Sequence, residues 1–467
     1  MSDTFKTDET PSADAWLSQA TNADRRGDFL AAFDLAQRGL VAHPDHLWLK
    51  HRAVLALARS GATDQARVLF RELGLVGEAE EDIAALDARL AKDHALATEG
   101  QERVVSARQA ADAYQSIYER SRGYYPGINA ATMRLIANSA GEAAELANRV
   151  LESCAETERR EGEDYYLAAT RAEAYLLVDD LAAASEALQH AAAVHGGDYA
   201  AVATTRRQLR LICDAKGFDT GMLTPLDAPG VIHYVGHMIA APGVAGRFAA
   251  ESEDKVAERI AARLRERSVG YGYGSLACGA DILFAEALLA RKAELHVVLP
   301  FDKDEFKQIS VARSMADWLA RFDDCFARAT SVSYATEDSY LGDDALFAYA
   351  SQLAMGLALL RASYLDTGVE QIAVWDREIP RHAAGTAVDV AFWRARGFHT
   401  EVIDCGPPAT GANPVAVGTA PQEKSQGRVV RAMLFGDVKG FSKLREVELP
   451  RFLEDVMGRF ATVLDSY

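Results

Sequence analysis

The chain has 467 residues, of which 49% are hydrophobic and 25% charged, and its formal net charge is −18. These values exclude a mostly disordered chain and allow about two to four domains. Because so acidic a surface repels phosphate backbones and anionic lipid headgroups, nucleic acid and membranes are not expected as partners.

Residues 1–12 are polar and acidic, and we expect them to form a disordered tail. They lack the basic and apolar segments of a secretory leader, and the apolar stretch around Leu353–Leu360 is far below the roughly 20 residues of a membrane span. The sequence therefore predicts a cytoplasmic protein. Wide spacing of the cysteines indicates buried free thiols rather than a disulfide framework or a zinc site; they are Cys154, Cys213, Cys278, Cys325 and Cys405.

Residues 13–220 are rich in alanine, leucine and arginine with helical periodicity, which predicts an all-α region. Two segments repeat at a spacing of 34 residues, GDFLAAFDLAQRGL from Gly27 and GATDQARVLFRELG from Gly61. In this register Ala32 matches Ala66, and small residues are what helix crossings need. A later copy has Asp179 in place of the glycine and Ala184 at the crossing.

This period resembles that of tetratricopeptide repeats, which implies stacked helical hairpins that sense a signal or dock a protein partner. The segment GYYPGINAATMRL, Gly123–Leu135, resembles the tetratricopeptide-like TRAF-binding region of apoptosis signal-regulating kinases and their bacterial relatives. In physical terms, Pro126 and Gly127 are expected to break one helix and Asn129 to cap the next. The segment is therefore either a helix-entry turn or part of a docking face.

Residues 228–406 change character, because short β-rich runs alternate with helical stretches. This alternation predicts a doubly wound, Rossmann-like α/β domain with a parallel sheet. One charged amphipathic helix is expected over residues 302–324. The expected strands are VIHYVGH, SVGYGYG, LHVVLP, TSVSY, QIAVWD and HTEVIDC.

A glycine-rich turn after the second expected strand is the candidate ligand site of this domain. The sequence GYGYGSLACGADILFAEALLA spans Gly270–Ala290 and opens a helix, whose N-terminus can bind an anion. The spacing is not the dinucleotide-binding fingerprint, because Ala277 occupies its last position. Glycines let the backbone approach a phosphate, and the candidate residues of the turn are Gly272, Gly274, Ser275, Gly279 and Asp281.

This turn resembles the Gly/Ala-Asp turn of SLOG-type nucleotide-sensor folds, which are related to LOG and DprA proteins. Two further segments support the resemblance: VGHMIAAPG, which contains Gly236, and GTAVDVAFWRARGFHTEVI, which begins with Gly385 and Thr386. LOG-type phosphoribohydrolases carry the pattern PGG-x-GT-x-x-E, but here Asp389 replaces the glutamate and the leading PGG is absent. The resemblance therefore implies binding of a nucleotide-derived ligand rather than hydrolysis, and the alternative is a purely structural α/β layer.

Polar residues at two strand ends could line the same pocket. Trp375 and Asp376 end the fifth expected strand, and such sheets bind ligands at the carboxyl ends of strands where the strand order reverses. His233 and His237 flank the end of the first strand. Each is either a catalytic histidine or, as is more common, a histidine hydrogen-bonded at a strand end.

Residues 407–427 are rich in proline, glycine and polar residues, which predicts a flexible linker. The final block, residues 428–467, predicts one strand, a tight turn and an amphipathic helix. Asp437 stands at the carboxyl end of this strand, where a hard carboxylate oxygen suits Mg²⁺ or Mn²⁺. The turn around Gly440 can present backbone N–H groups to phosphate oxygens. The alternative is a strand–turn–helix in which Asp437 only shapes the turn.

The sequence LFGDVKGFSKL, Leu434–Leu444, resembles the opening of the class III adenylate/guanylate cyclase domain. That resemblance implies a nucleoside triphosphate substrate, a head-to-tail homodimer and an α+β domain of which residues 428–467 are only the start. The second metal-binding aspartate lies further on in this family, so the chain is expected to be an inactive fragment of a longer protein. By the same resemblance, Asp437 and the Val438 carbonyl contact the metal, and Gly440, Phe441 and Ser442 form the phosphate turn.

The sequence thus predicts a multidomain chain: a helical-repeat sensor, an α/β ligand-binding domain, a linker and the start of a cyclase domain. For the parent protein this order predicts signal-regulated synthesis of a 3′,5′-cyclic nucleotide. The alternative is a non-enzymatic protein that senses a nucleotide-derived ligand and docks a protein partner.

Overall fold

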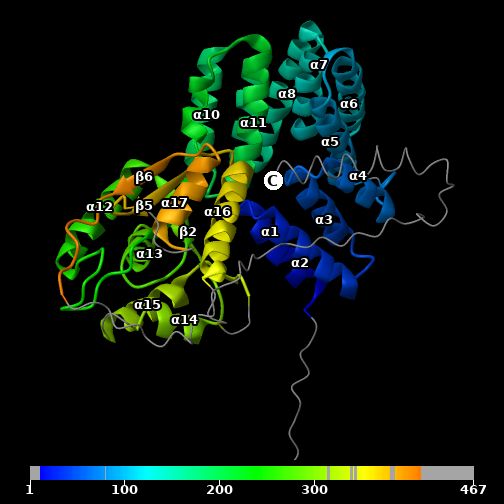
Figure 1. The fold of residues 1–467 in the computed structure, drawn as a ribbon. Coiled ribbons are helices and arrows are strands. Elements are labelled where there is room, and N and C mark those ends of the chain that lie inside the picture. Colours follow the sequence, from blue (N-terminus) through cyan, green and yellow to red (C-terminus); the bar gives the residue numbers. More distant parts are fainter. Residues whose placement is uncertain are drawn as a thin grey trace, which may run out of the picture. The chain divides into compact units, whose positions relative to one another are not determined.

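The structure is a computed structural model that describes residues 11–78, 80–312, 316–336, 340, 344–378 and 384–411 (Figure 1). These residues belong to one compact unit, which holds an N-terminal helical region and an α/β region. The expected cyclase start, residues 428–467, lies outside the described residues.

The helical region is a series of α-helices in which each helix from α1 to α10 packs on the next, α1 also contacts α3, and α11 packs on α9 and α7. Such packing between near neighbours in sequence is the pattern of stacked helical repeats, as predicted. The helices are α1 (Ala13–Arg25), α2 (Phe29–Ala42), α3 (Leu47–Arg59), α4 (Thr63–Glu72), α5 (Glu81–Ala97), α6 (Gly100–Ser121), α7 (Tyr124–Ile136), α8 (Ala140–Glu161), α9 (Tyr165–Leu177), α10 (Leu181–Val194) and α11 (Tyr199–Lys216), and a 3-10 helix, η1 (Thr220–Leu226), follows.

The turns between paired helices share a left-handed residue. Gly27, Gly61 and Asp179 have φ values of 74°, 89° and 66°. Glycine adopts this conformation freely, whereas aspartate does so at some cost. Lys216 helps to hold the aspartate turn, because its Nζ donates to Asp179 Oδ1 at 2.6 Å. Asn138, with φ 62° between α7 and α8, marks a further copy that the sequence pattern missed.

The small residues expected at the helix crossings are buried. Ala32, Ala66 and Ala184 have no exposed surface. Ala32 of α2 packs against Ala23 of α1 and Ala56 of α3. A larger side chain at such a crossing would force the helices apart, so the periodic alanines reflect close helix packing.

The GYYPGINAATMRL segment differs from its prediction. Pro126 and Gly127 lie inside the first turn of α7, which begins at Tyr124. Asn129 is therefore a buried residue within the helix and not its cap; its Nδ2 donates to the Tyr125 carbonyl at 2.9 Å. Proline is tolerated here because first-turn N–H groups have no helical partner. Gly127 is required by packing, since a Cβ there would lie 2.7 Å from Val150.

The α/β region contains a six-stranded sheet in the order β4-β3-β2-β1-β5-β6, and every neighbouring pair is parallel. The predicted parallel sheet with intervening helices is therefore confirmed. Successive strands step outward from β1 to β4, and the chain then returns to place β5 on the other side of β1. The strands are β1 (Gly230–Gly236), β2 (Val269–Gly274), β3 (Glu294–Leu299), β4 (Ser331–Tyr334), β5 (Val369–Val374) and β6 (Thr400–Ile403).

Helices cover both faces of this sheet. A short 3-10 helix, η2 (Ala250–Ser252), leads into α12 (Glu253–Glu266), which packs on α13 (Ala280–Ala290), and α13 contacts α15 (Ala316–Arg328). On the other face, α16 (Ala345–Leu365) contacts β1, β2 and β3 and lies beside α17 (Thr386–Ala395) (Figure 1). This division follows from the strand order, because right-handed crossovers place helices on opposite faces when the chain reverses direction.

The helix α16 is long and apolar enough to cross a membrane by length and composition. The apolar stretch that the sequence analysis recognised, Leu353–Leu360, is shorter than such a span. In the structure, α16 packs on β1, β2, β3 and β5 and on α11 of the helical region. It also carries Arg361, which is only 6% exposed.

Residues 302–324 do not form the single helix that was expected. The chain forms α14 (Lys303–Ser310), then turns at Val311 before α15 begins at Ala316. Two contacts explain the break. Val311 is fully buried, and the carbonyl of Ser310 accepts the N–H of Cys278 at 3.0 Å.

The linker was predicted to begin too early. The Ala409 N–H donates to the Gly246 carbonyl at 2.8 Å, and Gly246 N–H donates to the Ala409 carbonyl at 3.3 Å. Residues 407–411 are thus attached to the loop that follows β1. The remainder of the expected linker lies outside the described residues.

Candidate functional site

The strand order reverses between β1 and β5, which are neighbours in the sheet. In parallel α/β sheets, loops leaving the carboxyl ends of two such strands diverge and open a crevice. Here the two loops begin at His237 and Trp375, and the backbone N–H of His237 donates to the Val374 carbonyl at 3.1 Å. This edge is the candidate functional site.

A polar cluster occupies this edge. His237 Nε2 lies 3.1 Å from Asp376 Oδ1, and the opposite ring nitrogen, Nδ1, lies 3.4 Å from Thr386 Oγ1. Arg247, from the loop after β1, places its Nε 3.6 Å from Asp376 Oδ2. The structure therefore brings together Asp376 and Thr386, which were predicted, with Arg247, which was not. A single arginine in an irregular loop carries no sequence signal of such a role.

The electrostatics of the cluster favour a charged aspartate. Burial alone would raise the pKa of Asp376, but the Glu378 N–H, His237 and Arg247 together lower it. Burial lowers the pKa of His237, and Asp376 opposes that shift. The imidazole is held between a hydroxyl and a carboxylate, with Arg247 beside them. The imidazole, the hydroxyl and the Arg247 guanidinium can donate hydrogen bonds that orient a polar ligand or bind its phosphate group, while the Asp376 carboxylate accepts.

Two buried carboxyl groups lie on the helices that start at this edge. Asp281 stands in the first turn of α13 and Asp389 in the first turn of α17. Asp281 Oδ2 accepts the Ala277 N–H at 3.2 Å, whereas no partner meets Oδ1 within the described residues. Burial raises the pKa of Asp281 to about 7 and that of Asp389 to about 8. Both carboxyl groups therefore exchange protons near neutral pH.

The predicted glycines are explained first by packing within the protein. A Cβ on Gly272 would lie 2.2 Å from Leu288 of α13, and one on Gly274 would lie 2.4 Å from the Tyr234 ring. One on Gly236 would lie 2.3 Å from Ala280. Their Cβ positions are thus filled by neighbouring side chains, and phosphate has no space there.

The other predicted residues stay at the edge. Gly279 precedes α13 and has φ 101°. A Cβ on Gly279 would lie 2.4 Å from the backbone nitrogen of Ile239, in the loop after β1. Ser275 follows β2, and its carbonyl accepts the Tyr234 hydroxyl at 3.0 Å. Gly385 precedes α17 with φ 114°, and no atom of the described residues lies within 4 Å of its Cβ position. Among the predicted glycines of the described α/β region, Gly385 is therefore the one whose Cβ position meets no described neighbour.

His233 lies within the sheet and not at the site. It is 1% exposed, and its Nδ1 lies 3.2 Å from the side-chain nitrogen of Gln371 on β5. Burial lowers its pKa to about 3. These facts favour the interpretation as a hydrogen-bonded strand histidine.

Trp375 turns away from Asp376 into a separate cavity of about 560 Å³ beside β6. Arg377, Arg394 and His399 line the same cavity. Adjacent residues of an extended chain point to opposite sides, so Trp375 and Asp376 do not share the pocket that the sequence predicted for both.

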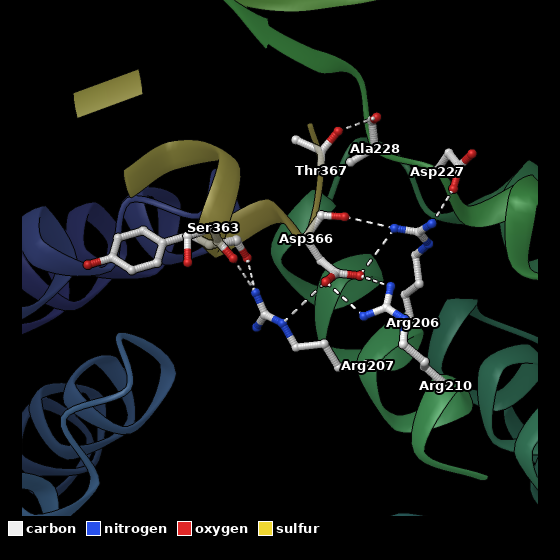
Figure 2. Close-up of polar contacts among 9 residues, drawn as sticks. Arg206, Arg207, Arg210, Asp227, Ala228, Ser363, Asp366 and Thr367 are labelled. Carbon is white, nitrogen blue, oxygen red and sulfur yellow. Dashed lines mark hydrogen bonds and ion pairs between the residues drawn. The ribbon is translucent and has the colours of Figure 1, made fainter. Parts of the chain in front are cut away.

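Polar contacts also join the helical region to the end of α16 (Figure 2). Arg210 of α11 donates to both carboxylate oxygens of Asp366, at 3.0 and 2.6 Å. Arg206 donates to the Asp366 carbonyl at 2.7 Å and pairs with Asp227 at 2.6 Å. Arg207 donates to the carbonyls of the last turn of α16. These contacts, together with Arg361 and the Arg26 carbonyl, tie the two regions.

A second polar centre is buried between α5, α7, α9 and α11 of the helical region. Lys92 Nζ of α5 donates to Asn129 Oδ1 of α7 at 2.8 Å and to Gln208 Oε1 of α11 at 3.2 Å. Burial lowers the pKa of Lys92 and raises that of Glu173 on α9. Sequence reasoning missed this centre, because its members are spread over more than one hundred residues and share no motif.

The predictions about the cysteines and about metal sites concern the rest of the chain. All five cysteines are free and buried, as expected. Within the described ranges, no three histidine, cysteine or carboxylate side chains gather as metal ligands would. The predicted cyclase residues all lie outside the described ranges; they are Asp437, Val438, Gly440, Phe441 and Ser442.

Comparisons with known proteins bear on the helical region. A sequence model of the family described as Tetratricopeptide Repeats-Sensor matches residues 15–134. The N-terminal region is therefore a tetratricopeptide-like helical repeat. Among solved structures, a thermophilic TPR protein of Thermus thermophilus is similar, with 15% identity and a TM-score of 0.34, over 44% of this chain and 100% of that one. No curated protein matches the chain.

Proposed function

We propose that the α/β region binds a nucleotide-derived ligand at the carboxyl edge between β1 and β5. The observation that carries this proposal is the His237–Asp376 pair, with Arg247 beside it, at the point where the strand order reverses. Two helices, α13 and α17, begin at the same edge, and helix N-termini attract phosphate groups.

Binding is favoured over hydrolysis by the geometry of the cluster. Thr386 is only 5% exposed, and its hydroxyl lies 3.4 Å from His237. A nucleophile needs both access to its substrate and a close hydrogen bond to its base. The imidazole is therefore better placed to hold a ligand than to activate the threonine.

The test is a thermal-shift and calorimetry screen of ATP, ADP-ribose, NAD and cyclic mononucleotides against the chain. A ligand at about one hundred times its dissociation constant adds roughly 2.7 kcal/mol to the free energy of unfolding. Arg247→Gln should remove most of that shift. Arg265→Gln, on the exposed face of α12, is the matched control and should retain it. A ligand-induced shift that persists in Arg247→Gln would place the ligand elsewhere.

The tetratricopeptide-like region would transmit this signal or dock a protein. Repeats of this kind commonly present an extended concave surface to a partner. We propose that the helical region is such a docking or sensing element, because it is tied directly to the end of α16 on the α/β region.

A second candidate function is nucleotide cyclisation, and the LFGDVKGFSKL motif favours it. In this proposal, the sensor controls a class III cyclase domain that starts near residue 428 and acts as a homodimer. Asp437 and the Val438 carbonyl would hold Mg²⁺ or Mn²⁺, and residues 440–442 would contact the triphosphate of the substrate. The ions would neutralise the triphosphate and assist attack by the ribose 3′-hydroxyl.

The cyclase proposal is tested on a chain extended through a complete cyclase domain. Mn²⁺-dependent release of pyrophosphate from ATP or GTP is expected, and Asp437→Ala should abolish it. Asp455→Ala, in the helix predicted after the turn, is the control and should keep most of the activity. Activity that survives Asp437→Ala would disprove the metal-binding role.

A further inference from the structure

A cavity of about 510 Å³ lies where the helical region meets the α/β region. Its walls come from the turn between α3 and α4, from α11 and from the last turn of α16. The residues that matter for its chemistry are Arg59, Ser60, Arg207, Ser363 and Asp366. A volume of this size is typical of small-molecule sites.

The charges around this cavity are unbalanced. Asp24 is shared by Arg52 and Arg59, and Asp366 and Asp227 are shared by three arginines of α11. Five guanidinium groups thus meet three carboxylates in these ion pairs, and Asp214 acts on Arg210 as a fourth, which leaves an excess of one positive charge. In a chain with a net charge of −18, such a local excess is a distinct basic patch that attracts anions.

Arg207 is the guanidinium with the weakest carboxylate contact. Its Nη2 donates to the carbonyls of Ser363 and Tyr364 at 2.6 and 2.8 Å, but its Nε lies 3.9 Å from Asp366. Its side chain is 40% exposed, so a ligand can reach it. Arg59 lines the same cavity and brings a second positive charge to it, while its Nη1 donates to Asp24 at 2.6 Å.

We propose that this junction cavity binds a small phosphate-bearing anion between Arg59 and Arg207. Guanidinium groups match phosphate oxygens in geometry and charge. The site is separate from the edge between β1 and β5, where Arg247 stands. Its walls belong to both regions, so an occupied cavity fastens the turn after α3 to the end of α16. Binding here is therefore coupled to the arrangement of the two regions.

The experiment is calorimetric titration of the full chain with pyrophosphate, with adenosine as a neutral control. Arg207→Gln should weaken pyrophosphate binding at least about tenfold, since one charge-assisted hydrogen-bonding group is lost. Ser363→Glu should weaken it similarly, because position 363 is exposed and a carboxylate there would occupy the arginines. Arg108→Gln, exposed on α6, removes the same charge elsewhere and should bind as the unaltered chain does.

Circular dichroism melts show that each variant is folded before titration. Pyrophosphate binding that is unchanged in both Arg207→Gln and Ser363→Glu would overturn the proposal, as would no binding to the unaltered chain. Loss of binding in Arg247→Gln alone would overturn it too, while supporting the separate site between β1 and β5. Loss in the two junction variants with retention in Arg247→Gln supports it.

Discussion

Buried carboxyl groups in the helical region can be compared with those in the α/β region. Asp24 of α1 is 3% exposed, and its Oδ2 accepts hydrogen bonds from Arg52 and Arg59 at 2.8 and 2.6 Å. Asp281 and Asp389 of the α/β region are 8% and 6% exposed. Neither of these two forms a salt bridge with any cation in the part of the chain that the structure describes.

The comparison teaches how each region keeps a carboxyl group out of water. In the helical region, arginines from a neighbouring helix supply fixed positive charge. In the α/β region, the protonated form is favoured because burial penalises the charged one. Asp24 is therefore committed to permanent ion pairs, whereas Asp281 and Asp389 near the β1–β5 edge, like Glu173 among the helices, can change charge with pH or with a bound ligand.

The largest expected effect is on the helical ion pairs. Asp24→Asn leaves Arg52 and Arg59 buried without a carboxylate, which should lower the free energy of unfolding by about 3–5 kcal/mol. Urea denaturation followed by circular dichroism measures this. Asp14→Asn, whose side chain is 95% exposed, is the control and should change stability little. Equal stability of the two variants would contradict the role of Asp24 in holding the two buried arginines.

An intermediate effect is expected where the two regions meet. Asp366→Asn removes the carboxylate shared by Arg206 and Arg210, and should cost about 2 kcal/mol. Hydrogen exchange should show faster opening at the end of α16 than in the β-strands, because the lost contacts lie there. Glu186→Gln, exposed on α10, is the control. Exchange in α16 that matches this control would show that the carboxylate does not hold the joint.

The smallest effect has the opposite sign. Burial raises the pKa of Asp389 to about 8 from an ordinary value of 3.8. The folded state holds this proton more tightly than the unfolded state, so stability is highest at low pH and falls as the pH rises toward 8. Asp389→Asn removes that loss but buries an amide in place of the carboxyl group, so the net gain over the unaltered chain at pH 9 should be about 1–2 kcal/mol.

Chemical denaturation at several pH values checks the Asp389 prediction. The gain from Asp389→Asn should shrink between pH 9 and pH 5, because the native carboxyl group becomes protonated over that range. Glu258→Gln, exposed on α12, should show no such trend. A gain that is independent of pH would mean that the amide stabilises the fold by packing, and the proton would have no part in it.

The repeat could be predicted because its contacts are local. Gly27, Gly61 and Asp179 recur at turns, and each turn needs a residue that accepts a left-handed backbone. The sheet could be predicted as parallel from the alternation of strands and helices. The break at Val311 could not, because it depends on Cys278, more than thirty residues away, which binds the last carbonyl of α14.

The candidate site was predicted in outline only. Asp376 could be predicted because it follows an apolar strand, and such positions face the ligand edge. Arg247 could not, since a loop of 13 residues separates β1 from η2 and nothing in its sequence says which side chain turns inward. The glycines of β2 were wrongly interpreted as a phosphate site. Close packing against neighbouring side chains requires glycine at these positions, just as close approach of a phosphate would.

The sheet order also affects how the chain is built. Val231 of β1 pairs with Val369 of β5, so the central pair cannot form until most of the α/β region has been synthesised. The helical repeats need only near neighbours, and folds rich in such local contacts form faster. During synthesis on the ribosome, the helices that carry Arg206, Arg207 and Arg210 can therefore fold before Asp366, the aspartate that these arginines contact, has been synthesised.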